Sequence, residues 1–231
     1  MKLATKISSA VIALVCLLSI TSESKCDVVS GSGTFANGSI VDDPMNNEVF
    51  SVISIAEAGL IEDISITITG LEHTNAGDLI AELRFLNQST AEPAYLFFRS
   101  NVDTAGSLGS RANLDGNYTF TSNQVNGNPT GANFWSESAL PDDETVNDGV
   151  EYFTGDTNGD FHDLSGPAFF GGENTVGDWQ LVITDANPFG NNEGSVVGWT
   201  IEFDTVAIPE PTVPVVWVVA VLGFVNRRRY R

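Results

Sequence analysis

The hexapeptide ISITIT at positions 64–69 alternates isoleucine with serine or threonine, so all three isoleucines face one side of an extended chain. A period of two among β-branched residues is typical of a strand that is buried on one face. The segment LIAELRF at 79–85 repeats this pattern with leucine, alanine and phenylalanine. No stretch between positions 25 and 208 shows the 3.6-residue period of an amphipathic helix. Alternation therefore predicts an all-β domain.

Other segments carry the same strand pattern, namely 49–55, 95–99, 118–121, 179–184 and 196–203. In the last two, alternation predicts two buried faces, formed by Trp179, Leu181 and Ile183 and by Val197, Trp199, Ile201 and Phe203. Clusters of glycine, asparagine and aspartate separate the segments, as turns and loops require. Many short strands with polar loops favour a sandwich or a jelly roll over a parallel sheet. The weakly patterned stretch 122–149 is expected to be a long loop.

The composition is strongly acidic, with 30 aspartates and glutamates against 10 lysines and arginines and a net charge of −20. Between positions 25 and 208 the basic residues are Lys25, Arg84, Arg99 and Arg111. Such a surface repels phosphate groups, and we expect no nucleic-acid partner. Cations are the natural counterpart, although the same charge can serve only to keep an exported protein soluble.

The N-terminus has the features of a secretory signal peptide. Two lysines precede an apolar stretch from Ile7 to Ile20, and SES at 22–24 offers the small residues that a signal peptidase accepts. We therefore expect a cleaved signal helix at 1–24 and an exported domain at 25–207. The signal carries one of the two cysteines, so the mature domain would have no intrachain disulfide.

Three motifs, in order along the chain, resemble the P domain (P/Homo B) of subtilisin-like proprotein convertases. The first is HTNAGDL at 73–79 after the isoleucine-rich strand. The second is NYTF at 117–120 with FFGGE at 169–173, and the third is GDWQLVITD at 177–185 with GSVVGWTI at 194–201. The match covers nearly all of the expected domain.

The resemblance implies a jelly-roll sandwich of about eight or nine strands, flanked here by the signal helix and a short apolar C-terminal helix. It implies structural roles for six motif residues: His73, Gly77, Asp78, Trp179, Asp185 and Trp199. The two tryptophans lie in alternating apolar strands, where each can bury roughly 200 Å². In the convertases a catalytic domain precedes the P domain, whereas only a short segment and the signal peptide precede the match here.

The C-terminus resembles the PEP-CTERM sorting signal of Gram-negative bacteria that make exopolysaccharide. Its motif residues flank an apolar run and are, in order, Pro209, Glu210, Pro211, Arg227, Arg228 and Arg229. The run would form a helix of about 21 Å, shorter than a bilayer core of roughly 30 Å. The resemblance implies that 208–231 anchors the protein transiently in the inner membrane, with the arginines in the cytoplasm, until an exosortase processes it. An ordinary tail anchor is the alternative.

The sequence contains no recognisable catalytic motif. It has two histidines, and neither G-x-S-x-G nor H-E-x-x-H occurs. His73 falls on the P-domain motif, where a structural role beside Asp78 is favoured over that of a base. A triad of His73 with a serine and an aspartate is the alternative, because triads are recognised by geometry. We expect no enzyme activity from the chain itself.

The best candidate metal site is the run DTNGDFHD at 156–163. Its oxygen ligands would be Asp156, Asn158, Asp160 and Asp163, which can surround a hard cation such as Ca²⁺. The run lacks the full spacing and the closing glutamate of an EF-hand, and a solvated acidic turn is the alternative. A second, weaker candidate spans 185–193.

These features predict an exported, non-catalytic β-sandwich that is sorted to the cell surface or the extracellular matrix, where it binds protein or exopolysaccharide. Signal peptidase and an exosortase would process it, and calcium is the candidate cofactor. An accessory role in serine-type, subtilisin-like proteolysis is the alternative that the P-domain resemblance implies. A purely structural role in the matrix is a third.

Overall fold

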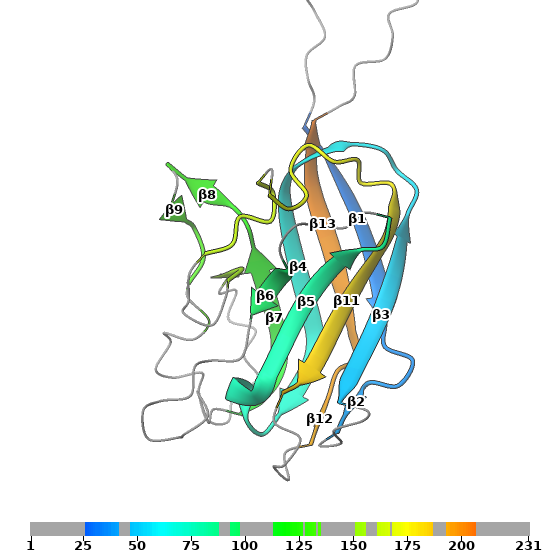
Figure 1. The fold of residues 1–231 in the computed structure, drawn as a ribbon, viewed down its shortest axis with the longest axis vertical. Helices are drawn as coiled ribbons and strands as arrows, with labels where there is room; N and C mark the ends of the chain where they lie inside the picture. Colours follow the sequence, from blue (N-terminus) through cyan, green and yellow to red (C-terminus); the bar gives the residue numbers. More distant parts are fainter. Residues whose placement is uncertain are drawn as a thin grey trace, which may run out of the picture. The chain divides into compact units, whose positions relative to one another are not determined.

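Extended strands form almost all of the regular structure (Figure 1). The computed structural model describes residues 26–41, 47–87, 93–97, 113–126, 128–132, 134, 151–155, 161–166, 168–186 and 193–206. The expected signal helix and sorting signal lie outside these residues, as do Asp156, Asn158 and Asp160. Over the described ranges, no helix has the length and hydrophobicity needed to cross a membrane. For those ranges the all-β prediction is confirmed.

The larger sheet has seven strands. Its hydrogen-bonded order is β1-β13-β4-β12-β2, with β7 paired to β4 and β10 paired to β7. The strands are β1 (Cys26–Thr34), β2 (Ser39–Ile40), β4 (Leu60–His73), β7 (Leu114–Thr121), β10 (Glu151–Phe153), β12 (Gly194–Ser195) and β13 (Gly198–Val206). The strand β4 pairs with β13, β12 and β7, and is therefore the centre of this sheet.

The strand β4 is 14 residues long, and its regular conformation is interrupted at Gly70. The backbone of Gly70 has a φ of +60°, which residues with a Cβ rarely adopt. The register of β4 against β7 shifts between Ile68 and Leu71, which marks a β-bulge. Oδ1 of Asn117 accepts a hydrogen bond of 2.9 Å from the Gly70 N–H. The strand β4 pairs with β13 before this interruption and with β12 after it, at Glu72 and His73.

The smaller sheet has four strands in the order β3-β11-β5-β6. They are β3 (Glu48–Ile55), β5 (Leu79–Phe85), β6 (Ala94–Phe97) and β11 (Gly177–Asp185), and the 3-10 turn η1 (Ala76–Asp78) joins β4 to β5. A separate hairpin consists of β8 (Gln124–Val125) and β9 (Asn128–Pro129). Its turn residue Asn126 has a φ of +55°, a conformation that asparagine tolerates in tight hairpins. The loop predicted over 122–149 thus begins with a short hairpin.

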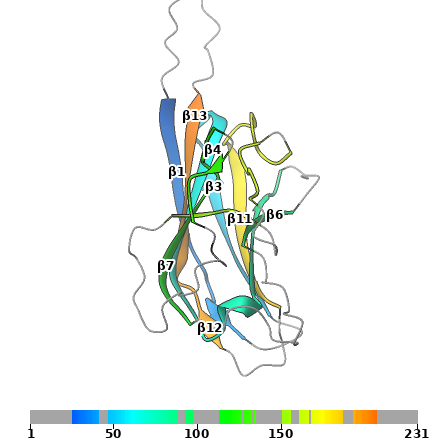
Figure 2. The same cartoon turned by 90° about the vertical axis from the view of Figure 1, so that its left-hand side faces the viewer.

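The two sheets pack face to face (Figure 2), and buried side chains from both fill the space between them. The ring centroids of Trp179 in β11 and Phe203 in β13 are 4.9 Å apart. Those of Phe97 in β6 and Phe120 in β7 are 5.2 Å apart. All described core residues lie within the compact unit Asp27–Val206. This segment therefore carries its own hydrophobic core, as an independently folding domain does.

The connections between the longer strands follow a regular order. The described strands of four or more residues are β1, β3, β4, β5, β6, β7, β11 and β13. Counted along the chain, they lie in the order first, eighth, third, sixth in the larger sheet and second, seventh, fourth, fifth in the smaller one. Every step between consecutive members of this set crosses between the sheets, except the step from β5 to β6.

The predicted strands 49–55, 79–85 and 179–184 coincide with β3, β5 and β11 to within two residues at each end. In these strands and in β4, the apolar side chains that alternation places inside are buried. Burial of one face therefore produces the period of two that the sequence shows.

Two departures concern β13 and β1. Val197 was expected inside but is 61% exposed, whereas Val196 is buried. The reason is that β13 begins only at Gly198, so the residues before it do not follow the alternation. The strand β1 has no counterpart among the predicted strands, because glycines occupy its positions 31 and 33 and interrupt the apolar pattern.

Candidate functional site

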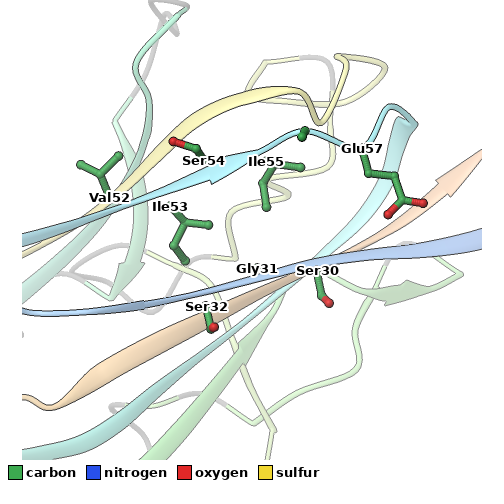
Figure 3. A pocket seen from close by; sticks show the side chains of 9 residues that line it. Ser30, Gly31, Ser32, Val52, Ile53, Ser54, Ile55 and Glu57 are labelled. Atoms are coloured by element: carbon green, nitrogen blue, oxygen red, sulfur yellow. The ribbon is translucent and has the colours of Figure 1, made fainter.

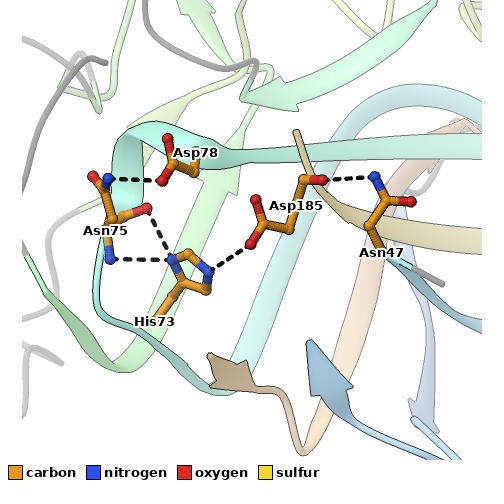
Figure 4. Close-up of polar contacts among 5 residues, drawn as sticks. All are labelled: Asn47, His73, Asn75, Asp78 and Asp185. Carbon is orange, nitrogen blue, oxygen red and sulfur yellow. Dashed lines mark hydrogen bonds and ion pairs between the residues drawn. The ribbon is translucent and has the colours of Figure 1, made fainter. Parts of the chain in front are cut away.

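His73 ends β4, and its imidazole lies inside the sandwich with no exposed surface (Figure 4). Its Nε2 atom is 3.3 Å from Oδ2 of Asp185, at the end of β11 in the other sheet. Its Nδ1 atom is 2.9 Å from the carbonyl oxygen of Asn75 and 3.1 Å from the Asn75 nitrogen. The ring thus links the two sheets and holds the loop after β4.

A second set of hydrogen bonds surrounds this contact. Nδ2 of Asn75 donates to Oδ2 of Asp78 at 2.7 Å, and Asp78 is fully buried in η1. Gly77 is buried in the same turn. Nδ2 of Asn47 donates to the carbonyl oxygen of Asp185 at 2.7 Å. Four of the six motif residues therefore lie close together, namely His73, Gly77, Asp78 and Asp185.

The surroundings of His73 keep its ring away from solvent. Both ring nitrogens contact protein atoms, and the Asp185 carboxylate is as buried as the ring. In the part of the chain that the structure describes, the ring contacts Asn75 and Asp185 and no serine hydroxyl. This arrangement can fix the ends of two strands in place, and it does not present the ring to a substrate.

Trp179 and Trp199 anchor the core from opposite sheets. Trp179 stacks on Phe85 with 4.5 Å between ring centroids, and its Nε1 donates to the carbonyl oxygen of Thr175 at 2.9 Å. Trp199 is also buried, but its Nε1 has no hydrogen-bond partner among the described residues. A Cβ at Gly33 would lie 3.0 Å from that Nε1, so glycine makes room for the indole. One tryptophan is therefore held by a hydrogen bond and by packing, the other by packing.

Asp163 is the one described member of the predicted calcium run. It is half-buried, and its Oδ1 accepts a hydrogen bond of 2.7 Å from Ser165 Oγ. The described residues contain no group of three or more histidine, cysteine, aspartate or glutamate side chains placed to hold a metal ion. The other three members of the run lie outside them, so calcium binding there stays a prediction. In the second candidate run, Asp185 is buried in the interior.

Asp63 lies near Asp163 and has a perturbed carboxyl group. Burial raises the pKa of Asp63, and the nearby carboxylates of Asp204 and Asp163 raise it further. Hydrogen bonds from Ser122 Oγ at 2.9 Å and from the Ile64 N–H at 2.8 Å act in the opposite direction. Asp63 is therefore protonated more readily than an ordinary aspartate.

The outward surface of the smaller sheet carries exposed apolar side chains that sequence reasoning did not single out. Two neighbouring rows of this surface, which we call the outer face, consist of Phe50, Val52, Glu82, Arg84, Tyr95, Gln180 and Val182, of which Val182 is buried between its neighbours. Phe50 is 57% exposed and Val52 is 43% exposed. The sequence feature that indicates this face is β3, whose residues EVFSVISI are apolar at both inward and outward positions.

The outer face carries one ion pair among its apolar residues. Arg84 is the only lysine or arginine in the described part of the chain. Its Nη2 donates to Oε2 of Glu82 at 2.8 Å, and both side chains stay partly exposed. Burial raises the pKa of the Tyr95 phenol, and Glu82 raises it further. At neutral pH, Tyr95 can therefore donate a hydrogen bond from this face.

A groove of about 390 Å³ opens between β1 and β3, the outermost strands of the two sheets (Figure 3). Ile53 and Ile55 point toward β1, whereas Val52 and Ser54 point away from it. A Cβ at Gly31 would lie 2.5 Å from Cδ1 of Ile55. Glycine in β1 therefore allows the two outermost strands to approach each other.

No protein-family model matches the chain. The curated proteins contain no match either. Among solved structures, the serine protease of Aeromonas sobria is similar at 14% identity and a TM-score of 0.39, over 84% of this chain and 29% of the protease chain. The complex of the Aeromonas sobria serine protease and the chaperone gives 16% identity and a TM-score of 0.35, with the same coverage. The chain spans 29% of these structures' length, and similarity at this level assigns neither fold nor function.

Two features with different chemistry thus stand apart in the sandwich. The network around His73 is buried and ties the two sheets together. The outer face is partly exposed, most of all at Phe50 and Val52, and combines aromatic surface with hydrogen-bond donors and acceptors. It is suited to contact with a ligand by packing and hydrogen bonding.

Proposed function

We propose that this chain is an exported, non-catalytic module that binds a neutral polysaccharide through its outer face. The observation that carries the proposal is the exposure of Phe50 on the same outward face as Gln180 of the adjacent strand β11 and as Glu82 and Arg84 of β5, the strand beyond it. A sugar ring has an apolar C–H face that packs on an aromatic ring. Its neighbouring hydroxyls pair with planar groups such as guanidinium, carboxylate and amide, which offer several donors and acceptors.

The charge of the protein favours a neutral glycan over an anionic one. The chain has a net charge of −20, and anionic chains would be repelled over most of its surface. Arg84 does not offset this repulsion, because its guanidinium is paired with Glu82. The outer face therefore offers hydrogen bonds and apolar contact without a surplus of positive charge.

We further propose that the domain is a jelly roll of the P-domain type and that its tail is a PEP-CTERM sorting signal. The strand order first-eighth-third-sixth and second-seventh-fourth-fifth supports the first part, because a jelly roll of two Greek keys has this order. The second part is supported by the order of motif, apolar run and arginines at the C-terminus. A sorting signal of this kind implies that the sandwich lies outside the cell, where exopolysaccharide is available.

The burial of His73 supports the non-catalytic part of the proposal, because a general base must reach the proton that it removes. The test is hydrolysis of casein and of an unstructured peptide library by purified 25–207. We expect no cleavage above the blank. Cleavage that His73→Ala abolishes would instead support the proteolytic alternative.

Affinity electrophoresis of 25–207 in gels that contain neutral or anionic polysaccharide tests the binding. We expect retardation in at least one neutral gel and none in the anionic gel. Phe50→Ala should weaken binding about tenfold, which corresponds to about 1.4 kcal/mol. Val125→Ala is the matched control, since Val125 is 59% exposed and lies on β8, away from the outer face. Migration that no neutral polysaccharide changes would overturn the proposal, and capture of a protein alone would show a different partner.

A further inference from the structure

The strand β3 has one free edge. In the described part of the chain its one partner is β11, so the other side of β3 carries unpaired backbone groups. The register against β11 is continuous over all eight residues, and the strand contains neither proline nor glycine. A long, regular edge of this kind is a template for another strand, and proteins that must stay monomeric usually interrupt it.

The free backbone groups of β3 belong to its outward-facing residues. The Asp185 N–H of β11 donates to the carbonyl oxygen of Asn47 at 2.9 Å. The residue just before β3 that is bonded to β11 is therefore odd-numbered. Bonded positions alternate along an antiparallel strand, so odd-numbered residues of β3 face β11. Phe50 and Val52 therefore direct their N–H and C=O groups to the free edge, and their side chains are exposed beside it.

Charge is also absent from the middle of this edge. In a chain of net charge −20, the one charged residue of β3 is Glu48, at its first position. The groove toward β1 borders the same edge, and the β1 residues that line it are Ser30, Gly31 and Ser32. Small side chains there leave space for an approaching strand.

We propose that β3 pairs with β3 of a second copy of this chain, antiparallel across a two-fold axis. A two-fold interface uses the same surface twice, so the surface must be complementary to itself. With Ser51 on the axis, Phe50 of one copy lies opposite Val52 of the other, and Glu48 lies opposite Ser54. Apolar side chains then meet each other and no two carboxylates are directly opposed, as favourable cross-strand pairs require. The two smaller sheets become one continuous sheet.

The same geometry predicts how salt acts on the dimer. Each copy is strongly acidic, and Asp178 lies next to Ser54 on the outward surface, where Oγ of Ser54 donates to it. Repulsion between the copies opposes pairing, and salt screens it. Dimerisation should therefore strengthen as sodium chloride is raised. A dimer held by ion pairs would weaken instead.

Sedimentation equilibrium of 25–207, which contains the complete described core, measures the mass over micromolar to millimolar concentration. We expect a reversible rise toward twice the monomer mass, stronger at high salt. Val52→Pro removes an N–H from the free edge and none from the ladder to β11, so it should return the mass to that of the monomer. Val52→Thr keeps the N–H and is the control, which should still dimerise.

A second measurement is independent of the folding of the proline variant. Ser51→Cys in a Cys26→Ser background places two thiols opposite each other across the axis, within the reach of a disulfide. We expect mild oxidation to give a covalent dimer faster than it does for Ser39→Cys, whose serine is exposed on β2. A monomer at every concentration and salt, or a dimer that Val52→Pro leaves intact, would overturn the proposal. Glycan binding is measured separately by affinity electrophoresis, so the dimer proposal and the glycan proposal can fail independently of each other.

Discussion

His73 and Asp185 join the two sheets inside the sandwich, with 3.3 Å between Nε2 of the histidine and Oδ2 of the aspartate. Neither side chain has exposed surface, although 112 residues separate them in the sequence. The contact ties the end of β4 to the end of β11, and Asn47 and Asn75 extend it into the adjoining loops. Its loss would leave a buried polar group without a partner, which is costly.

Asp185→Ala should lower the free energy of unfolding of 25–207 by about 3 kcal/mol, because the buried imidazole loses its partner. Asp185→Asn keeps a side-chain oxygen near Nε2 and should cost less. Urea unfolding followed by tryptophan fluorescence measures both. Asp178→Ala, in the same strand but partly exposed, is the control and should change stability by no more than about 0.5 kcal/mol. Similar losses at positions 185 and 178 would contradict the structural role of the pair.

The two buried tryptophans should respond differently to replacement by phenylalanine. Trp179→Phe leaves the carbonyl oxygen of Thr175 without its donor, whereas Trp199→Phe removes a buried N–H that has no described partner. Both changes also create a cavity of similar size. We expect Trp179→Phe to destabilise the domain by about 1 kcal/mol more than Trp199→Phe. Thermal unfolding of both variants gives the comparison, and an equal or reversed order would show that the hydrogen bond is unimportant.

Asp63→Asn should make the domain more stable at neutral pH. Burial raises the pKa of Asp63 above the ordinary value of 3.8, so the folded state favours the protonated carboxyl. The stability that Asp63 contributes is therefore complete below about pH 4 and declines as the pH rises through its raised pKa. Asparagine keeps an oxygen for Ser122 and Ile64 but carries no charge, so this decline should disappear.

Urea unfolding of 25–207 at pH 4 and pH 7 measures this effect. Asp115→Asn, at an exposed position, is the control and should change stability by no more than about 0.5 kcal/mol at pH 7. If Asp63→Asn lost as much stability between pH 4 and pH 7 as the parent does, the burial of the charge would not be the dominant effect.

Calcium should stabilise the domain if the run 156–163 binds it. A ligand that binds only the folded state at about 100 times its dissociation constant adds roughly 2.7 kcal/mol. Melting in millimolar Ca²⁺ against sodium chloride of equal ionic strength separates a site from general screening. Asp156→Asn combined with Asp160→Asn should remove the calcium-specific increase while leaving the fold intact. An unchanged response in this variant would identify the run as a solvated acidic turn.

Replacement of Pro209 and Pro211 by alanine should block sorting. We expect the variant to stay in the inner membrane with its arginine-rich end uncleaved, because the extended PEP motif is what a processing peptidase would recognise. Cell fractionation and mass spectrometry of the C-terminus provide the measurement. Release that is unchanged from the parent would rule out the sorting-signal interpretation.

Local patterns in the sequence located most of the longer strands and the buried side chains within them. Alternation located β3, β5 and β11 and placed Trp179 in the interior, because a strand buried on one face needs apolar side chains at every second position. The pattern failed at Val197, where the strand begins one residue later, and in β1, where Gly31 and Gly33 replace the apolar side chains.

The neighbours of each strand depend on the whole fold. Nothing near His73 in the sequence predicts that it faces Asp185, because this contact exists only once β4 and β11 lie in opposing sheets. Phe50 and Val52 resemble core residues in the sequence, yet they lie on the outward side of an outermost strand and stay exposed. Long-range strand pairing decides which side of an apolar strand is covered, and the alternation within a single strand contains no information about that pairing.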